Sequence, residues 1–102
     1  MALVNIESAL RKILNTLKKI DKGGGLEVLS YKRNRGITII KQGADLYCLR
    51  ERGYLEQELK CTFRELQRHL KSMMKREFPR SRKVRIYVLN DPSEAGIARK
   101  KL

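Results

Sequence analysis

Hydrophobic residues recur at helical spacing in two separate parts of the chain. The first run follows Asn5, a residue type that often caps the N-terminus of a helix. Three consecutive glycines, Gly23 to Gly25, come after it, and glycine readily takes the left-handed backbone that ends helices. The pattern therefore predicts a first helix that these glycines stop. Its apolar positions are Ile6, Leu10, Ile13, Leu14, Leu17 and Ile20.

The second run begins after Thr62 and predicts a helix that ends before Pro79. Thr62 and Glu65 have the spacing of a capping box, in which each side chain bonds to the backbone N–H of the other residue. We therefore expect a well-capped amphipathic helix. The residues of its apolar stripe are Phe63, Leu66, Leu70, Met73 and Met74, with Phe78 near the end.

The rest of the chain has the pattern of short strands separated by turn residues. Residues 33–36 predict a hairpin loop with a glycine at its end, and Gln42-Gly43 and Gly53 predict two further breaks. The expected strand segments are 26–32, 37–41, 45–52, 54–61 and 84–89. The order of elements is then α-β-β-β-(β)-α-β. We expect an α+β fold with a mostly antiparallel sheet and both helices packed on one of its faces.

The size of the chain limits it to one domain. Its 102 residues, 41% of them hydrophobic, suffice for one compact core but not for two. We assign residues 1–92 to this domain and residues 93–102 to a short basic tail. No apolar run approaches the roughly 18 residues that span a bilayer, and the start lacks the layout of a signal peptide. We expect a cytoplasmic protein without a membrane partner, and its 34% of charged residues is typical of thermophiles.

Charge is the strongest feature of the composition. The net charge is +13, from 24 Lys and Arg against 11 Asp and Glu. More than half of that excess, +7, lies between residues 64 and 85. A small domain with such a concentration of charge commonly binds a polyanion. We favour nucleic acid as the partner over an acidic protein or a membrane surface. We also favour it over the explanation that the charge serves solubility alone.

Four basic residues of the second helix lie on one line along its axis. They are Arg64, Arg68, Lys71 and Lys75, and we call them the cationic ridge. Their spacing of i, i+4, i+7 and i+11 places them within an arc of about 60°, opposite the apolar stripe, over a length of about 16 Å. Glu65 and Glu77 lie off this line, whereas a helix that is merely soluble would mix acids into it. The ridge is the most specific functional signal in the sequence.

Further basic residues extend the predicted phosphate-binding surface beyond the ridge. They are Arg76, Arg80, Arg82, Lys83 and Arg85, together with Arg33 and Arg35 at the tip of the predicted hairpin. For the basic residues of the hairpin, a role in keeping the surface solvated is as good an explanation as a role in binding. The four tyrosines are expected mainly in the core rather than stacked on unpaired bases. With few residues left to read bases, we predict recognition of shape and backbone.

The sequence contains no arrangement of residues that predicts catalysis. There is one histidine, and there is no phosphate-binding loop motif. Cys48 and Cys61 are the only cysteines, and they lack partners at zinc-binding spacing. We therefore expect a protein that is not an enzyme and that carries no metal and no cofactor.

The sequence leaves the state of the two thiols open. A tight hairpin at Gly53 would pair residues whose numbers sum to about 105. Cys48 would then face Gln57, and Cys61 would lie near Ala44, which keeps the thiols apart. Free thiols, a bridge within the chain in another register, and a bridge between two chains are the three alternatives.

A resemblance to a known family points in the same direction as the charge. The stretch LKCTFRELQRHLKSMMKREFPRSRKVRIYVLND, residues 59–91 and about a third of the chain, resembles the THUMP domain. In both, a strand leads into a helix, a basic connection and a hydrophobic strand that ends in a polar turn. THUMP domains occur in tRNA-modifying enzymes and in small adapters of tRNA acetylation, where they hold the acceptor region of tRNA. Because no catalytic domain is attached here, the resemblance implies a module that acts alone or assists an RNA-modifying enzyme.

A second resemblance is limited to the order of elements. The α-β-β-β-α order of residues 5–77 is similar to that of double-stranded-RNA-binding domains and of the Alu-binding proteins of the signal recognition particle. Residues 63–66 read FREL where the first of these families has a basic KKxAK motif, and its GPxH loop is absent. The order of elements therefore supports RNA binding only in general terms.

The leading prediction is a stand-alone RNA-binding module for tRNA or another structured RNA. One alternative is an architectural protein that coats DNA, which also needs only a basic surface. Another is a subunit whose basic face docks an acidic enzyme. A free edge strand at Val84–Leu89 would in addition allow two copies to pair as a homodimer.

Overall fold

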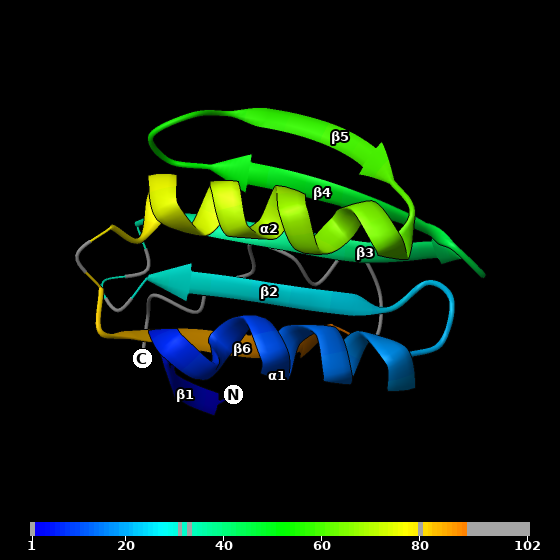
Figure 1. Cartoon of the computed structure of the whole chain (residues 1–102), viewed down its shortest axis with the longest axis horizontal. Coiled ribbons are helices and arrows are strands. Elements are labelled where there is room, and N and C mark those ends of the chain that lie inside the picture. Colours follow the sequence, from blue (N-terminus) through cyan, green and yellow to red (C-terminus); the bar gives the residue numbers. More distant parts are fainter. Residues whose placement is uncertain (1, 31, 33, 80, 90–102) are drawn as a thin grey trace.

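The structure is a computed structural model that describes residues 2–30, 32, 34–79 and 81–89 (Figure 1). It confirms the predicted α+β fold, with β1 as an additional short strand at the start. None of the described helices is long and apolar enough to cross a membrane. The elements are β1 (Ala2–Asn5), α1 (Ile6–Lys19), β2 (Gly25–Ser30), β3 (Gly36–Gly43), β4 (Leu46–Arg52), β5 (Gln57–Cys61), α2 (Phe63–Glu77) and β6 (Lys83–Leu89).

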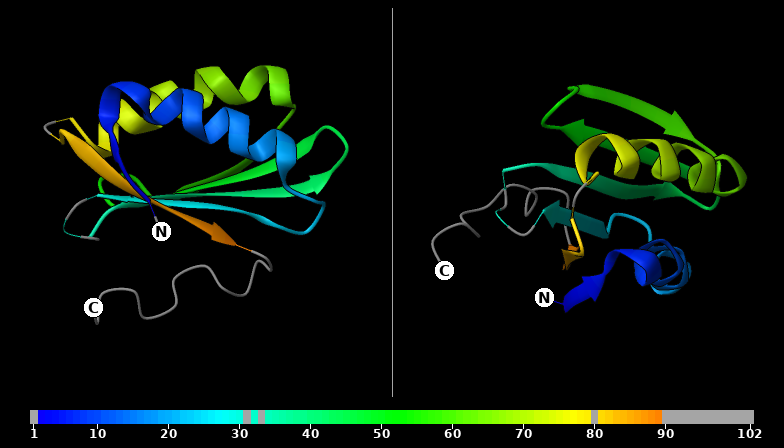
Figure 2. Two further views of the ribbon diagram at one scale, coloured as in Figure 1. Left: turned by 90° about the horizontal axis from the view of Figure 1, so that it is seen from below. Right: turned by 60° about the vertical axis from the view of Figure 1, so that its left-hand side comes forward.

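The described strands form one antiparallel sheet in the order β1-β6-β2-β3-β4-β5. Both helices cover the same face of this sheet, as predicted (Figure 2). β6 lies inside the sheet, because β1 pairs along it from Ala2↔Ile86 to Asn5↔Lys83. The prediction that Val84–Leu89 is a free edge is therefore wrong. The edges of the described sheet are β1 and β5.

The helix α1 begins where the sequence predicts but ends before the glycines. Asn5 occupies the N-cap position without a capping hydrogen bond from its side chain. The N–H of Ile6 donates instead to the carbonyl oxygen of Arg82 at 2.8 Å, which ties the start of α1 to the segment before β6. The C-cap is Ile20, and Gly23, with φ 98°, lies in the turn toward β2. The glycines therefore shape this turn and do not stop the helix.

The helix α2 has the predicted cap and the predicted end. The N–H of Thr62 donates to Oε1 of Glu65 at 3.0 Å, and the N–H of Glu65 donates to Oγ1 of Thr62 at 3.3 Å, which completes the capping box. The N–H of Phe63 donates to Oδ1 of Asp45 at 2.8 Å, so the turn between β3 and β4 holds the first turn of α2. The helix ends at Glu77, two residues before Pro79.

The core lies between the two helices and the sheet. Burying a Leu or Ile side chain contributes roughly 1.5–3 kcal/mol, so the apolar stripes decide which face of each helix turns inward. In α1 these core residues are Ala9, Ile13 and Leu17, and in α2 they include Leu66, Leu70 and Met73. On the central strands they meet Val28, Ile37, Ile39 and Leu49.

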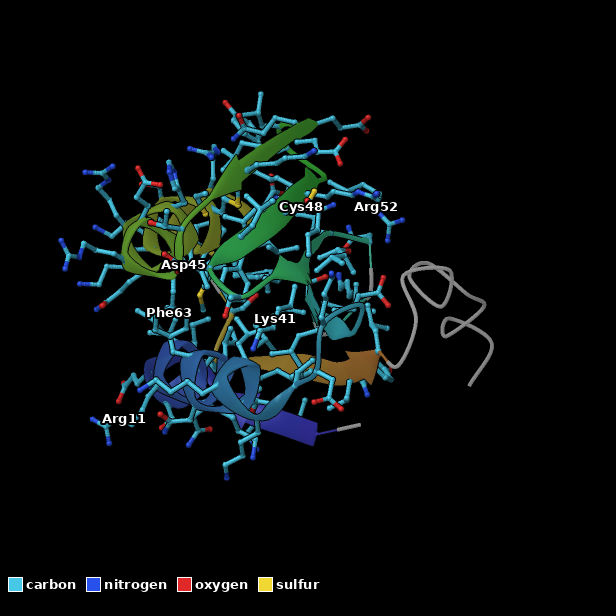
Figure 3. All side chains as sticks on the ribbon, turned by 90° about the vertical axis from the view of Figure 1, so that its right-hand side faces the viewer. Arg11, Lys41, Asp45, Cys48, Arg52 and Phe63 are labelled. Atoms are coloured by element: carbon cyan, nitrogen blue, oxygen red, sulfur yellow. The ribbon has the colours of Figure 1, made fainter. Side chains whose placement is uncertain are left out.

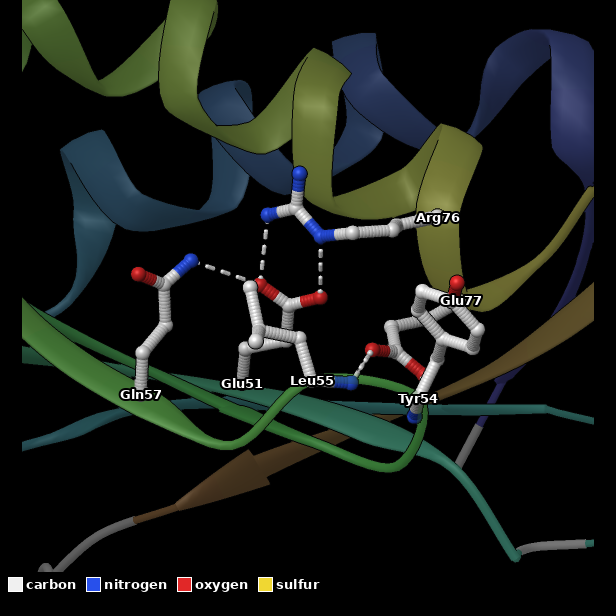
Figure 4. A network of polar contacts seen from close by, with 6 residues as sticks. All are labelled: Glu51, Tyr54, Leu55, Gln57, Arg76 and Glu77. Carbon is white, nitrogen blue, oxygen red and sulfur yellow. Dashed lines mark hydrogen bonds and ion pairs between the residues drawn. The ribbon is translucent and has the colours of Figure 1, made fainter.

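One polar network crosses this core where β4 faces the end of α2 (Figure 4). Glu51 is 3% exposed, and its carboxylate accepts hydrogen bonds from Nη2 and Nε of Arg76 at 2.7 and 2.8 Å. Nε2 of Gln57 donates to the same carboxylate at 2.9 Å. Burial by itself raises the pKa of Glu51, but the hydrogen bonds and the charge of Arg76 lower it to about 2. Glu51 is therefore charged at neutral pH, and the stability of this buried charge depends on Arg76.

Removal of Arg76 should destabilise the fold. The variant Arg76→Leu leaves the Glu51 carboxylate buried without its cation, and we expect the free energy of unfolding to fall by about 3 kcal/mol. The measurement is urea unfolding followed by circular dichroism. The double variant Glu51→Leu/Arg76→Leu should recover most of the loss, because no unpaired charge then remains in the core.

A matched control is the exposed pair of Arg50 and Glu58, whose side chains are 51% and 55% exposed and 3.1 Å apart. An exposed pair contributes at most about 1 kcal/mol, so Arg50→Gln should change the stability little. Equal losses for Arg50→Gln and Arg76→Leu would contradict the central role of the buried pair.

Acid should weaken the fold through Glu51. Its pKa is lowered from 4.5 to about 2 by folding, so its contribution is complete above pH 4.5 and is lost as the pH falls toward 2. The loss attributable to Glu51 should be on the order of 2 kcal/mol by pH 3. Urea unfolding at pH 6 and pH 3 should show a larger loss for the wild type than for Glu51→Gln. Identical losses for the two proteins would rule this mechanism out.

Candidate nucleic-acid interface

The cationic ridge lies on the outer side of α2, away from the sheet. All four of its residues are exposed, and none of them forms an ion pair within the described part of the chain. Glu65, the acid nearest to the start of the ridge, is held in the capping box with Thr62. Figure 3 shows nitrogen-tipped side chains of α2 pointing away from the sheet. The ridge therefore presents four exposed cations in one row, none of them in an ion pair with a described residue.

The neighbouring helix adds more positive charge to the same layer. α1 packs beside α2 (Figure 1), and its exposed basic residues include Arg11, Lys12 and Lys19. Nζ of Lys18 lies 5.8 Å from the centroid of the Phe63 ring, a cation–π contact across the two helices. Arg11 points outward from α1 in Figure 3. The basic surface thus extends over both helices.

A second basic region lies at the end of the sheet near the C-terminus of α2. A groove of about 870 Å³ opens there between the β2–β3 hairpin and the connection from α2 to β6. Its basic residues are Lys32, Arg35, Arg82 and Lys83, and we call it the basic groove. The sequence predicted the hairpin cluster and the connection as separate regions. They meet because β2 pairs with β6 antiparallel, with Ser30 opposite Val84.

The charge of the basic groove is strongly positive. None of its four cations forms an ion pair with another described residue. One acid, Glu77, also lines the groove. Its carboxylate accepts hydrogen bonds from the N–H of Tyr54 at 2.8 Å and from the N–H of Leu55 at 3.1 Å. Glu77 therefore holds the loop between β4 and β5, and the cations stay available for an anionic ligand.

Other basic residues of the predicted surface lie elsewhere. Arg76 turns inward to Glu51, with 31% of its side chain exposed, so its prediction as a surface phosphate contact is not supported. Arg85 is half-buried and lies opposite Leu3 on the sheet face that the helices leave uncovered, and it therefore does not continue the ridge. Arg33 and Arg80 lie outside the described residues.

The tyrosines divide into two kinds. Tyr47 and Tyr87 are buried, as expected, and the ring of Tyr47 lies 5.7 Å from that of Phe63. Tyr54 is 72% exposed. Tyr31 is outside the described residues. The strand predicted over residues 54–61 begins only at Gln57, so Tyr54 lies in the loop that follows Gly53 and not within a strand.

The two cysteines lie on neighbouring strands but on opposite faces of the sheet. Cys61 is opposite Tyr47, and Cys48 is opposite Lys60, so the predicted register is wrong by three. The reason is that residues 53–56 form a four-residue loop and not a tight turn. Adjacent positions of a strand point to opposite faces, which excludes a bridge between these two thiols in this fold. Both thiols are free and buried, and burial raises the pKa of each.

Comparisons of the chain with protein-family models, with curated proteins and with solved structures gave no match. The resemblance of residues 59–91 to the THUMP domain therefore stays a prediction. Within the described residues, no three His, Cys, Asp or Glu side chains gather into a group that could hold a metal ion.

The thiols should react slowly in the folded protein. Because both are buried and have raised pKa values, a thiol reagent such as DTNB should modify them at least about tenfold more slowly before unfolding than after it. Two thiols per chain should titrate in denaturant. An unreduced mass two hydrogens below that of the reduced chain would instead show an internal bridge and contradict the register.

Proposed function

We propose that this protein binds structured RNA, such as tRNA, through contacts of its basic surface with the phosphate backbone. The observation that carries the proposal is the cationic ridge. It consists of four exposed cations in a row on α2 without an acid among them, and none is neutralised by another described residue. The basic groove adds four more cations at the end of the same helix.

The spacing of these charges suits a polyanion with regularly placed charges. Successive ridge residues are three or four positions apart, which separates them by about 4.5–6 Å along the helix. Flexible Lys and Arg side chains can adjust to phosphates over such distances, and each contact releases bound counterions. Such contacts fix the position of a nucleic acid but carry no sequence information. The proposed recognition is therefore of shape and backbone.

Two considerations favour RNA over DNA as the partner. The resemblance of residues 59–91 to the THUMP domain implies a tRNA-binding module, and an adapter beside an RNA-modifying enzyme is the role that this resemblance suggests. Folded RNA also offers its shape and its 2′-hydroxyl groups, which proteins recognise without reading base edges. The same cations would bind duplex DNA less well, because its groove geometry differs.

Binding should depend steeply on salt. If ridge and groove together engage about six phosphates, the logarithm of the association constant should fall with the logarithm of the salt concentration with a slope of roughly −5. Filter binding of folded tRNA between 50 and 300 mM KCl measures this slope. A slope near zero would overturn the proposal. Equal affinity for tRNA and for duplex DNA would favour the architectural DNA-binding alternative.

Charge reversal on the ridge should weaken this binding. The variant Arg68→Glu/Lys71→Glu should make the salt slope shallower by about two, because two phosphate contacts are lost. The matched control is Arg52→Glu/Lys60→Glu. It makes the same change of charge at exposed positions of β4 and β5, on the face that the helices leave uncovered. An equal effect of both variants would show that only net charge matters.

A further inference from the structure

Tyr54 is an exposed aromatic residue beside the basic groove. It is 72% exposed, whereas Tyr47 and Tyr87 are buried in the sheet. It belongs to the loop of residues 53–56 between β4 and β5, and Figure 4 shows it next to Glu77 at the end of α2. Because Glu77 also lines the basic groove, the ring and the groove cations lie at the same end of the molecule.

The loop that carries Tyr54 is held in place. Glu77 is 2% exposed, and its carboxylate accepts the N–H groups of Tyr54 and Leu55 at 2.8 and 3.1 Å. Both N–H groups therefore donate to one buried carboxyl group, which ties the backbone of the loop to the end of α2. Gly53 has φ 147°, and a side chain there would collide with Glu77 and with Arg35 of the groove. The backbone before Tyr54 is therefore packed against the groove.

An exposed ring on an anchored loop beside a cluster of cations suits one chemical class of ligand. Bases of single-stranded nucleic acid stack on aromatic side chains while basic residues follow the backbone. Bases inside a duplex are stacked on each other and offer no free face to such a ring. We infer that Tyr54 stacks on an unpaired base of the RNA while the phosphates next to that base lie in the basic groove.

This inference rests on the proposed function and specifies its substrate class, which is folded RNA with unpaired nucleotides beside a helix. The ridge contacts the backbone of the paired region, and the groove and Tyr54 hold the unpaired nucleotides. The ridge alone would not distinguish a fully paired duplex from one with unpaired nucleotides, so the preference between these two RNAs belongs to Tyr54 and the groove.

A fluorescence experiment tests the stacking. The chain contains no tryptophan, so Tyr54→Trp introduces a single reporter at the inferred contact. Two RNA duplexes with the same paired region are compared, one blunt and one with a tail of five unpaired uridines. Stacking quenches indole emission, so the tailed RNA should quench the reporter and the blunt RNA should leave its emission nearly unchanged.

Affinity measurements with further variants test the energetic role of the ring. The wild type should bind the tailed RNA about tenfold more tightly than the blunt one, and Tyr54→Leu should remove that preference without changing the affinity for the blunt RNA. Tyr54→Phe keeps the ring and should retain the preference. The matched control is Leu55→Ala in the same loop, at a residue that is 40% exposed. Thermal melts followed by circular dichroism confirm that each variant is folded.

The outcomes separate this inference from the proposed function. Equal binding of the two RNAs by the wild type, with the steep salt dependence intact, would overturn the role of Tyr54 and leave the proposed function in place. A loss of preference in Leu55→Ala equal to that in Tyr54→Leu would also overturn it, because the effect would then belong to the loop and not to the ring. Failure to bind either RNA would overturn both.

Discussion

The pairing of one buried carboxylate with one arginine sets how α2 lies on the sheet. Glu51 is removed from water, so its charge must be met by a partner from the facing helix, and Arg76 supplies two hydrogen bonds to it. Successive residues of a helix are turned by about 100°, so drawing Arg76 and the apolar stripe inward directs the cationic ridge outward. The interaction that stabilises the fold thereby also orients the surface that we propose to bind RNA.

The position of β6 inside the sheet likewise determines where the second basic region, the basic groove, lies. Because β6 pairs antiparallel with β2, the residues that follow β2 and those that precede β6 meet at one end of the sheet. Arg35 and Arg82 therefore line one groove although they are far apart in the chain. The strand β1 covers the other side of β6, which removes the free edge that would have allowed two copies to pair there.

The two basic regions would contribute differently to binding. The ridge is a row of charges on a helix surface, suited to backbone contacts that supply affinity and salt dependence. The groove combines cations with an exposed ring, a combination that can favour unpaired nucleotides. Glu77 connects the two, because it ends α2 and its carboxylate holds the loop of Tyr54. The fold by itself does not determine which ligand binds, since function depends on the site that a fold carries.

The sequence by itself determined the features that depend on neighbours within a turn or two of the chain. Helix periodicity, the capping box at Thr62 and the outward row of the ridge are local, and the structure agrees with them. The predicted strand segments agree as well, except that residues 54–56 lie in a loop. Only the tertiary structure decided what depends on long-range pairing. Lys75 and Arg76 are neighbours with the same charge, but Arg76 pairs with the buried carboxylate of Glu51 whereas Lys75 is exposed on the ridge. The register of the cysteines, the inner place of β6 and the basic groove follow from loop length and strand order, which no local pattern encodes.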